Sequence, residues 1–356
     1  MALNQVGLER LNTATTKKIG TNKNLIINGA MNVAQRGTSS TSGGYQTVDR
    51  MPVYHTGGAV TQSQGSLTSG SPFENGFTKY LRLTNTTANT GTDVARSTIY
   101  KIEAQDVANS GWNYKSSSSY ITISFWVRSS VSQQFYIMAR TQDGTSQAYP
   151  FSLGTLSADT WTKVTHSIPG NSNLQFDNNN DRGLEFFLYV SLGTDFTSSS
   201  VTLNAWGAYT SSARLPDYTN SWAAATNATF DITGYQLEVG SVATDFEHRS
   251  HAQELQLCKR YYYDITSTNS AYSKLIIHQN GYFQHPQIKH PVEMRAAPTI
   301  TFSSVARRAL NAGSDTSESI SNTTAGKTSW TSYVTNTSNT FHTFIYDYPI
   351  KFEAEL

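Results

Sequence analysis

The chain has 356 residues, of which 14% are charged and 12% aromatic, and its formal net charge is +1. This length predicts two domains, or one large β domain with a smaller module. The near-neutral charge gives no reason to expect nucleic acid or an anionic membrane as a partner. The many hydroxyl and β-branched residues favour strands over long surface helices.

Membrane insertion and disulfide bonding are not expected either. No run of about 18 apolar residues occurs, and residues 1–18 lack the apolar region and cleavage site of a signal peptide, so we expect synthesis in the cytoplasm. Cys258 is the one cysteine, which excludes an intrachain disulfide. Lys259 and Arg260 do not share its helix face, so we expect Cys258 to be a buried, unreactive thiol.

The first 22 residues differ in pattern from the rest of the chain. Leu3, Val6 and Leu11 could line one side of a short helix, which is too short to be stable alone and would need a partner. From Asn24 the apolar period changes to two, and the stretch NLIINGAMNVAQRG has its first apolar run stopped at Asn28-Gly29. We interpret this stretch as the first edge strand of a β domain spanning 23–250, lying near the closing segment QLEVG.

Alternating apolar residues then predict about ten short strands, separated by clusters rich in Gly, Asn, Asp and Ser. No long helices alternate with them, so the fold class is all-β: an antiparallel β-sandwich or jelly roll. The clearest predicted strands are 97–103, 120–130, 133–141, 160–168, 183–193, 200–210 and 229–240.

After this domain the pattern changes twice. HAQELQLCKRYYYD (251–264) is the only convincing internal helix, and we interpret 251–265 as a helical connector. The segments APTITFSS, TSWTSYVTN and NTFHTFIYDYPIKFEAEL again predict strands, so residues 266–356 form a small C-terminal β module.

Several segments resemble the jelly-roll superfamily of carbohydrate-binding modules: NLIINGAMNVAQRG, YITISFWVRSS, TWTKVTHSI and FDITGYQLEVGSVATDFEHRS. Together with TVDRM and ELQLCKRYYY, they resemble tail-fibre or virion structural proteins of tailed bacteriophages, especially marine or cyanophage-like ones. The resemblance covers about residues 1–265, and PVEMRAAPTITFSS and EAEL look like the ends of such proteins.

This resemblance implies a non-enzymatic protein on the exterior of a virion, at the tail or the capsid surface, made in the host cytoplasm. It implies a homotrimer whose residues 1–22 dock to other virion proteins and whose jelly roll attaches to host-surface polysaccharide. One alternative is a capsid decoration or other exterior assembly protein that binds no glycan. Another is a polysaccharide depolymerase, which would need two carboxylates across a cleft, and no signature groups the candidates Glu185, Asp231, Glu238 and Glu293.

Strand alternation also indicates a possible glycan platform, because several strands carry aromatic and polar residues opposite their main apolar face. If those strands are neighbours, sugar rings could stack on this second face. Otherwise loops, the C-terminal module or another subunit would cover it. The candidate residues are Trp126, Arg128, Tyr136, Arg140, Phe187, Tyr189, Asn204 and Trp206.

One segment partly resembles a calcium loop. In DNNNDRGLE, Asp177, Asn179 and Asp181 have the spacing of calcium ligands, but Gly183 comes one place late and Leu188 replaces the bidentate Glu. A turn built from Asn and Asp explains the segment as well. We therefore expect no cofactor, with Ca²⁺ at these three residues left open.

Overall fold

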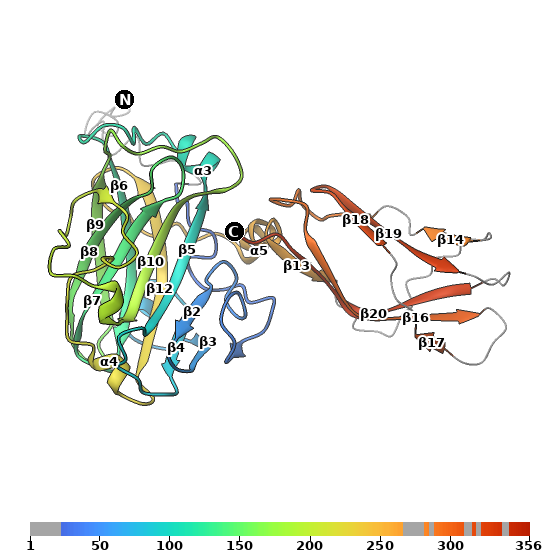
Figure 1. Cartoon of the computed structure of the whole chain (residues 1–356), viewed down its shortest axis with the longest axis horizontal. Helices are drawn as coiled ribbons and strands as arrows, with labels where there is room; N and C mark the ends of the chain where they lie inside the picture. The colour runs from blue at the N-terminus through green and yellow to red at the C-terminus, as the bar shows by residue number, and fades with distance from the viewer. Residues whose placement is uncertain (1–22, 266–280, 285–287, 310–314, 318–321, 337–341) are drawn as a thin grey trace, which may run out of the picture. The chain divides into compact units, whose positions relative to one another are not determined.

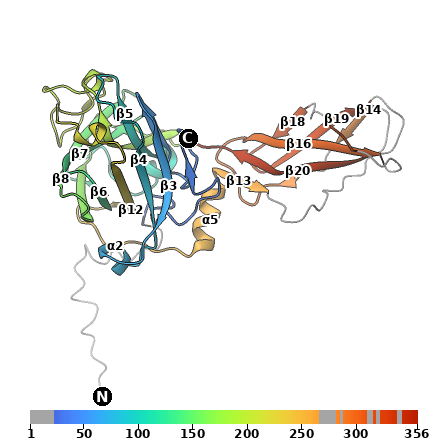
Figure 2. The same ribbon diagram turned by 90° about the horizontal axis from the view of Figure 1, so that it is seen from below.

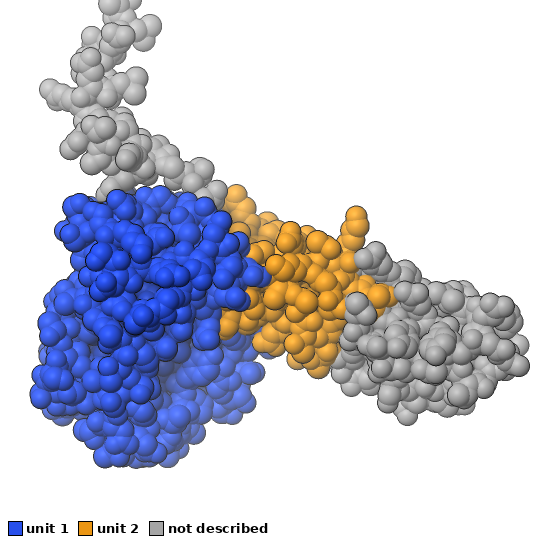
Figure 3. All heavy atoms as spheres, turned by 45° about the horizontal axis from the view of Figure 1, so that its top comes forward, with its two compact units in different colours: residues 1–250 blue, residues 251–356 orange. Residues whose placement is uncertain are grey.

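A computed structural model describes residues 23–265, 281–284, 288–309, 315–317, 322–336 and 342–356. The chain divides into two compact units, Met1–Ser250 and His251–Leu356, coloured separately in Figure 3. We call them the N-terminal and C-terminal units. The predicted helix within residues 1–22 lies outside the described residues. No helix among the described residues is long and apolar enough to cross a membrane.

The N-terminal unit contains two six-stranded antiparallel sheets, seen as overlapping layers in Figure 1. The β6 sheet has the order β1 (Ser39–Ser40), β3 (Val60–Ser66), β4 (Lys79–Asn85), β12 (Thr229–Val239), β6 (Tyr120–Ser129), β9 (Thr162–Pro169). The β10 sheet has the order β11 (Gly207–Ala208), β8 (Gln147–Leu156), β7 (Gln133–Thr141), β10 (Arg182–Leu192), β5 (Ala95–Glu103), β2 (Val53–Thr56).

The core lies between these sheets and follows the predicted period of two. On β6, Ile121, Ile123, Phe125 and Val127 are all at most 1% exposed, and they join one cluster with inward residues of β10 such as Phe186. Burial of this apolar stripe is the main favourable contribution to folding. The predicted all-β sandwich or jelly roll is therefore confirmed, with short helices confined to connections: α2 (Ser71–Glu74), α3 (Ala104–Ala108), η1 (Thr194–Phe196) and α4 (Ser221–Ala224).

The opening stretch forms no strand, so that part of the prediction is wrong, although its predicted neighbour is correct. The amide of Leu25 donates to the carbonyl of Leu237 on β12 (2.9 Å), and the amide of Tyr235 donates to Gly29 (2.9 Å). Asn28 and Met31 have φ values of 60° and 58°. Such left-handed residues turn the chain out of extended geometry, so the segment follows β12 without joining the sheet.

The segment 200–210 was also predicted as a strand and is mostly a loop. Only Gly207–Ala208 pairs, as β11 against β8, and Asn204 has a φ of 60°. Leu203 and Tyr209 from this segment pack onto a cluster on the outside of the β10 sheet. The apolar residues that gave this segment its alternating pattern therefore pack onto a face of the sheet and do not form a paired strand.

The C-terminal unit begins with α5 (His251–Lys259), which is shorter than the predicted helix, because Tyr262–Ile265 form strand β13 paired with β20. Consecutive tyrosines favour a strand over a helix. Cys258 is 1% exposed, as predicted. Figure 2 shows the strands of this unit, which form two small sheets: β13, β20 (His342–Glu353), β16 (Thr299–Ala309) and β17 (Asp315–Ser317); and β14 (Gly281–Gln284), β19 (Ser329–Asn336), β15 (Ile288–Lys289) and β18 (Asn322–Ala325).

Candidate functional site

The sequence-predicted platform residues lie on two different sheets. Trp126 and Arg128 are on β6, whereas Tyr136 and Arg140 are on β7 in the β10 sheet. Phe187 and Tyr189 on β10 do neighbour β7, with Tyr189 paired to Tyr136. The condition that the strands be neighbours therefore holds for β7 and β10 and fails for β6, so there is no single platform.

Asn204 and Trp206 join neither group. Asn204 is exposed in its loop, and its backbone amide donates to the carbonyl of Pro150 (2.9 Å). The indole N–H of Trp206 donates to the carbonyl of Pro169 (2.7 Å), and its ring lies 5.3 Å from that of Tyr149, against the main core. Both residues hold the connection between β10 and β12 in place.

The chain itself covers most of the outer face of the β10 sheet. Tyr136 is 5% and Tyr189 is 2% exposed, and they cluster with Leu215 and Tyr218 of the connection that follows β10. The Arg140 guanidinium lies 3.8 Å from the centre of the Tyr209 ring. Burial raises the pKa of both Tyr136 and Tyr189 above the usual value for tyrosine. For these residues the alternative of a loop-covered face describes the structure.

The outer face of the β6 sheet presents a fixed row of charges beside aromatic rings. Asp231 on β12 is fully buried and accepts two hydrogen bonds from each neighbour, Arg82 on β4 (2.7 and 2.9 Å) and Arg128 on β6 (3.0 and 2.7 Å). Hydrogen bonding to Asp231 raises the pKa of Arg82. The Arg128 guanidinium also lies 4.8 Å from the centre of the Trp161 ring. One carboxylate thus orients two partly exposed cations at this surface.

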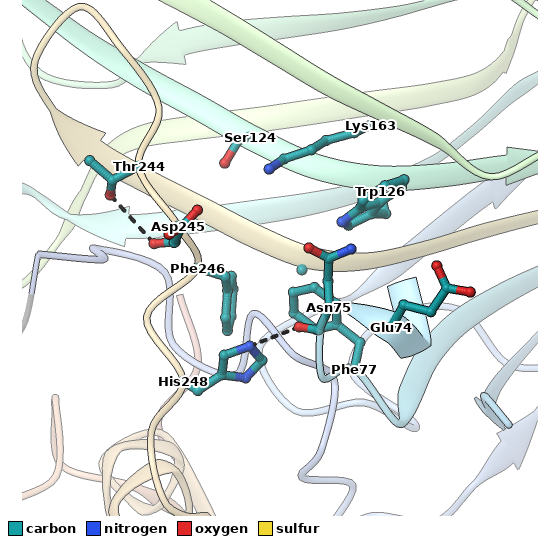
Figure 4. A pocket seen from close by; sticks show the side chains of 11 residues that line it. Glu74, Asn75, Phe77, Ser124, Trp126, Lys163, Thr244, Asp245, Phe246 and His248 are labelled. Carbon is teal, nitrogen blue, oxygen red and sulfur yellow. Dashed lines mark hydrogen bonds between the residues drawn. The ribbon is translucent and has the colours of Figure 1, made fainter. Parts of the chain in front are cut away.

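A pocket of about 360 Å³ opens on the same sheet face, and Figure 4 shows the side chains that line it. Of the residues that the sequence predicted for a glycan platform, Trp126 lines this pocket. It lies on β6, where it pairs with Thr233 on β12 and with Lys163 on β9. The complete lining is Glu74, Asn75, Phe77, Ser124, Trp126, Lys163, Gly234, Thr244, Asp245, Phe246 and His248.

The apolar part of the pocket depends on one glycine. The backbone of β12 is irregular between Thr233 and Gln236, and Gly234 within it has a φ of 65°. A Cβ at Gly234 would lie 2.7 Å from the Phe77 ring, so only glycine lets that ring approach the strand. Phe77 in turn contacts Phe246 edge to face, with ring centres 4.8 Å apart.

The opposite wall, residues 244–248, is held by two buried polar side chains of β12. Glu238 accepts hydrogen bonds from the backbone amide and hydroxyl of Thr244, both at 2.7 Å. Gln236 accepts from the amide of Glu247 (2.8 Å) and donates to the carbonyl of Asp245 (3.3 Å). A hydrogen bond between His248 Nε2 and the carbonyl of Asn75 (3.1 Å), drawn in Figure 4, links this wall to the chain after α2.

Apart from Trp126, sequence reasoning missed these pocket residues. Phe77 and Phe246 lie outside the strands, where alternation gives no information about facing. Gln236 and Glu238 do occupy outward positions on a predicted strand. Outward polar residues are normally solvated, so nothing in the pattern indicates that a folded-over segment buries them.

The segment that partly resembles a calcium loop forms a turn. Asn179 Oδ1 accepts the amide of Asp181 (3.0 Å), and the carbonyls of Asn179 and Asp181 receive the amides of Gln105 and Ala104 at the start of α3, both at 2.8 Å. Asp177 and Asp181 are exposed. No group of three or more His, Cys, Asp or Glu side chains able to hold a metal occurs in the part of the chain that the structure describes. In this structure the segment forms a turn, and calcium binding at Asp177, Asn179 and Asp181 stays a prediction.

No protein-family model matches the chain, and no curated protein matches it. Solved structures that align with part of the chain include the enzymatically active domain of tailspike protein 4 from bacteriophage CBA120. It is 10% identical with a TM-score of 0.32, over 61% of this chain and 22% of that solved chain. The N-terminal cellulose-binding domain of Cellulomonas fimi β-1,4-glucanase C is 9% identical with a TM-score of 0.30, over 60% of this chain and 99% of that domain.

A third similar structure is the family 11 carbohydrate-binding module of the cellulosomal cellulase Lic26A-Cel5E from Clostridium thermocellum. It is 12% identical with a TM-score of 0.28, over 60% of this chain and 98% of the module. Likenesses this distant assign neither a ligand nor an activity to this chain.

Proposed function

We propose that the chain is a non-enzymatic virion structural protein, a tail fibre that binds host-surface glycans through the outer face of the β6 sheet. The observation that carries this proposal is the pocket beside Trp126. Its volume of about 360 Å³ lies within the usual range for small-ligand sites. The virion assignment rests on the sequence resemblance given above.

The chemistry of the face suits a sugar. Trp126 on β6 and Trp161, which precedes β9, are both partly exposed and pack against one cluster, and the apolar side of a pyranose could stack on such rings. Arg128, Lys163 and Asp245 add donors and acceptors for hydroxyl groups around them. Because Asp231 already fixes Arg128, and Gln236 and Glu238 hold the segment that carries Asp245, little ordering of these two groups is needed on binding.

Three of the four carboxylates that the sequence offers for hydrolysis are buried, which supports a non-enzymatic role for those three; Glu74 and Asp245 do line the pocket. Glu185 is 1% exposed and accepts from Arg182 (3.3 Å), while Asp231 and Glu238 are bonded as described above. Glycoside hydrolysis needs two carboxyl groups that face a cleft and can reach the substrate. Glu185, Asp231 and Glu238 instead accept hydrogen bonds within the β-sandwich.

The proposal includes a homotrimer that docks to the particle through residues 1–22. One pocket of about 360 Å³ would bind a glycan weakly, and three linked copies would act together through effective concentration. Adhesion to a repeating polysaccharide is the setting in which such weak, repeated contacts suffice.

The test is Trp126→Ala in the full-length protein, assayed on an array of host-surface glycans and by titration with each glycan that binds. Loss of the stacking surface is expected to weaken binding at least about tenfold, or about 1.4 kcal/mol. Phe73→Ala is the matched control, since Phe73 is an exposed aromatic on α2 that does not line the pocket.

Other outcomes would replace the proposal. If no host glycan binds and Trp126→Ala instead changes the sedimentation of the oligomer, the face is an assembly interface and the exterior assembly alternative takes over. Release of reducing sugar from host envelope would point to a depolymerase.

A further inference from the structure

A second pocket, of about 330 Å³, opens on the outer face of the β10 sheet near its β2 edge, beside the connection after β10, which supplies Arg214 to its lining. We propose that it is a separate carbohydrate site that binds a sugar unit bearing a carboxylate, such as a uronic acid. This inference does not depend on glycan binding at the β6 sheet.

The register of three neighbouring strands creates the hollow. Ser97 on β5 pairs with Tyr54 on β2 at one side and with Tyr189 on β10 at the other. Adjacent strands are about 4.8 Å apart, so the two tyrosine backbones are separated by about 10 Å. A small serine between two large aromatic residues leaves room for a single ring, with the serine hydroxyl at its floor.

The walls of this hollow are aromatic. Phe187 on β10 forms one wall, backed by the buried Tyr189 ring, which stacks nearly parallel to it with ring centres 5.8 Å apart and 12° between their planes. Tyr54 is 39% exposed, among the few large apolar side chains that the described surface shows. Ring faces of this kind bind the apolar side of a sugar ring.

Two polar groups give the ligand its chemistry. Arg214 lines the pocket with its guanidinium 4.5 Å from the centre of the Phe196 ring, and its Nε donates to the carbonyl of Ser211 (2.9 Å). Within the described chain the structure gives this cation no carboxylate partner. A guanidinium held beside aromatic walls favours an anion that accepts two hydrogen bonds, which a carboxylate does.

The second polar group is His55, which also lines the pocket. Its Nδ1 lies 3.0 Å from the carbonyl of Gly58, so Nδ1 carries the proton and Nε2 is an acceptor. Nε2 is buried and has no partner among the described residues. Because this atom is enclosed, the hydroxyl that a ligand can reach in the pocket is that of Ser97 at its floor. A carboxylate for Arg214 and a hydroxyl for Ser97 together describe an acidic sugar rather than a fatty or aromatic ligand.

The experiment uses the full-length Trp126→Ala protein, so that the first site does not contribute, and measures binding of trigalacturonate against its carboxyl-reduced, neutral counterpart by titration. We expect trigalacturonate to bind at least about tenfold more tightly than the neutral sugar. Arg214→Gln should remove this preference, and Tyr54→Ala should weaken both sugars. Arg182→Gln is the control, because Arg182 is on the same sheet and outside the pocket.

Arg214→Lys keeps the positive charge but loses the planar guanidinium that can donate two hydrogen bonds to one carboxylate. This variant should therefore retain only part of the preference for the acidic sugar. A partial effect of this kind would show that Arg214 acts in recognition and that its loss does not simply unfold the protein. The proposal is overturned if the parent and Trp126→Ala proteins bind neither sugar, if binding shows no preference for the acid, or if Arg214→Gln and Tyr54→Ala change nothing. Loss of acidic-sugar binding in Trp126→Ala alone would assign it to the first site instead.

Discussion

At the scale of single residues, the pair Asn28-Gly29 shows how one polar side chain and one glycine hold the opening segment in place. Asn28 is fully buried, and its amide nitrogen donates to the carbonyls of Val33 (2.8 Å) and Asp49 (2.9 Å). Its oxygen accepts the amide of Val33 (2.9 Å). A side chain at Gly29 would overlap the carbonyl oxygen of Tyr235. The pair therefore lets the backbone of the opening segment lie close against β12, and it does not mark the end of a strand.

Gly29→Ala is expected to destabilise the N-terminal unit by about 1–3 kcal/mol, since the added methyl group must displace backbone rather than a flexible side chain. Urea unfolding should show this as a lower midpoint with an unchanged slope. Gly207→Ala is the matched control because a Cβ there meets nothing within 4 Å. Equal midpoints for the two variants would contradict the close approach.

At the scale of elements, β12 builds both halves of the Trp126 pocket. Its irregular stretch at Gly234 admits the Phe77 ring, and its next two outward residues, Gln236 and Glu238, tie down 244–248. Between them, Leu237 points into the core and is fully buried. One strand thus joins the stability of the sandwich to the shape of the site, because alternate side chains serve opposite faces.

Gln236→Ala is expected to loosen the wall while leaving the sandwich folded, because it removes hydrogen bonds to Glu247 and Asp245. Hydrogen–deuterium exchange should rise in 244–248 but not in β6, and glycan affinity should fall several-fold. Gln134→Ala is the control, since Gln134 is exposed on β7 and bonds only the Ser152 hydroxyl (3.1 Å). Unchanged exchange in 244–248 would show that other contacts hold the wall.

At the scale of the whole molecule, the two units have separate cores. The small core of the C-terminal unit includes Tyr263, Trp330 and Phe352. His290, 8% exposed, lies against it, with the Tyr263 hydroxyl 2.6 Å from Nδ1 and the Gly326 carbonyl 3.0 Å from Nε2. This arrangement suits a neutral ring that accepts at Nδ1 and donates at Nε2. Burial lowers the pKa of His290 below its ordinary value of 6.5.

The C-terminal unit is therefore expected to lose stability in acid. Below about pH 6.5 an unfolded chain protonates His290 more readily than the folded one does, so the free energy of unfolding falls as the pH falls. Hydrogen–deuterium exchange of β13 between about pH 7 and pH 5, corrected for intrinsic rates, should report this loss.

His290→Gln should make that pH dependence shallower, since glutamine can accept from Tyr263 and donate to Gly326 without titrating. His251→Gln is the control because His251 is exposed at the start of α5 in the same unit. An equally steep pH dependence in both variants would remove His290 as the cause.

Sequence reasoning predicted the strands correctly where burial repeats every second residue, as on β6 and β10. It predicted secondary structure incorrectly where contacts with distant parts of the chain, and not the local apolar period, decide the conformation. Tyr262–Ile265 belong to a sheet because β20 pairs with them. The segment around Trp206 is a loop because its apolar residues pack onto the outer face of the β10 sheet and do not pair as a strand. The order of strands in space is not written in alternation, so Trp126 and Tyr136, ten residues apart, could not be assigned to different sheets.

The sequence by itself determined the all-β class, the inward stripes of the sandwich and the presence of outward aromatic residues, because these depend on local period and composition. Only the tertiary structure decided which outward residues meet and which are covered. Sheet order separates Trp126 from Tyr189, the connection after β10 buries Tyr136, and the folded-over segment 244–248 completes the pocket. These outcomes depend on pairing between residues distant in the chain, which no local pattern specifies.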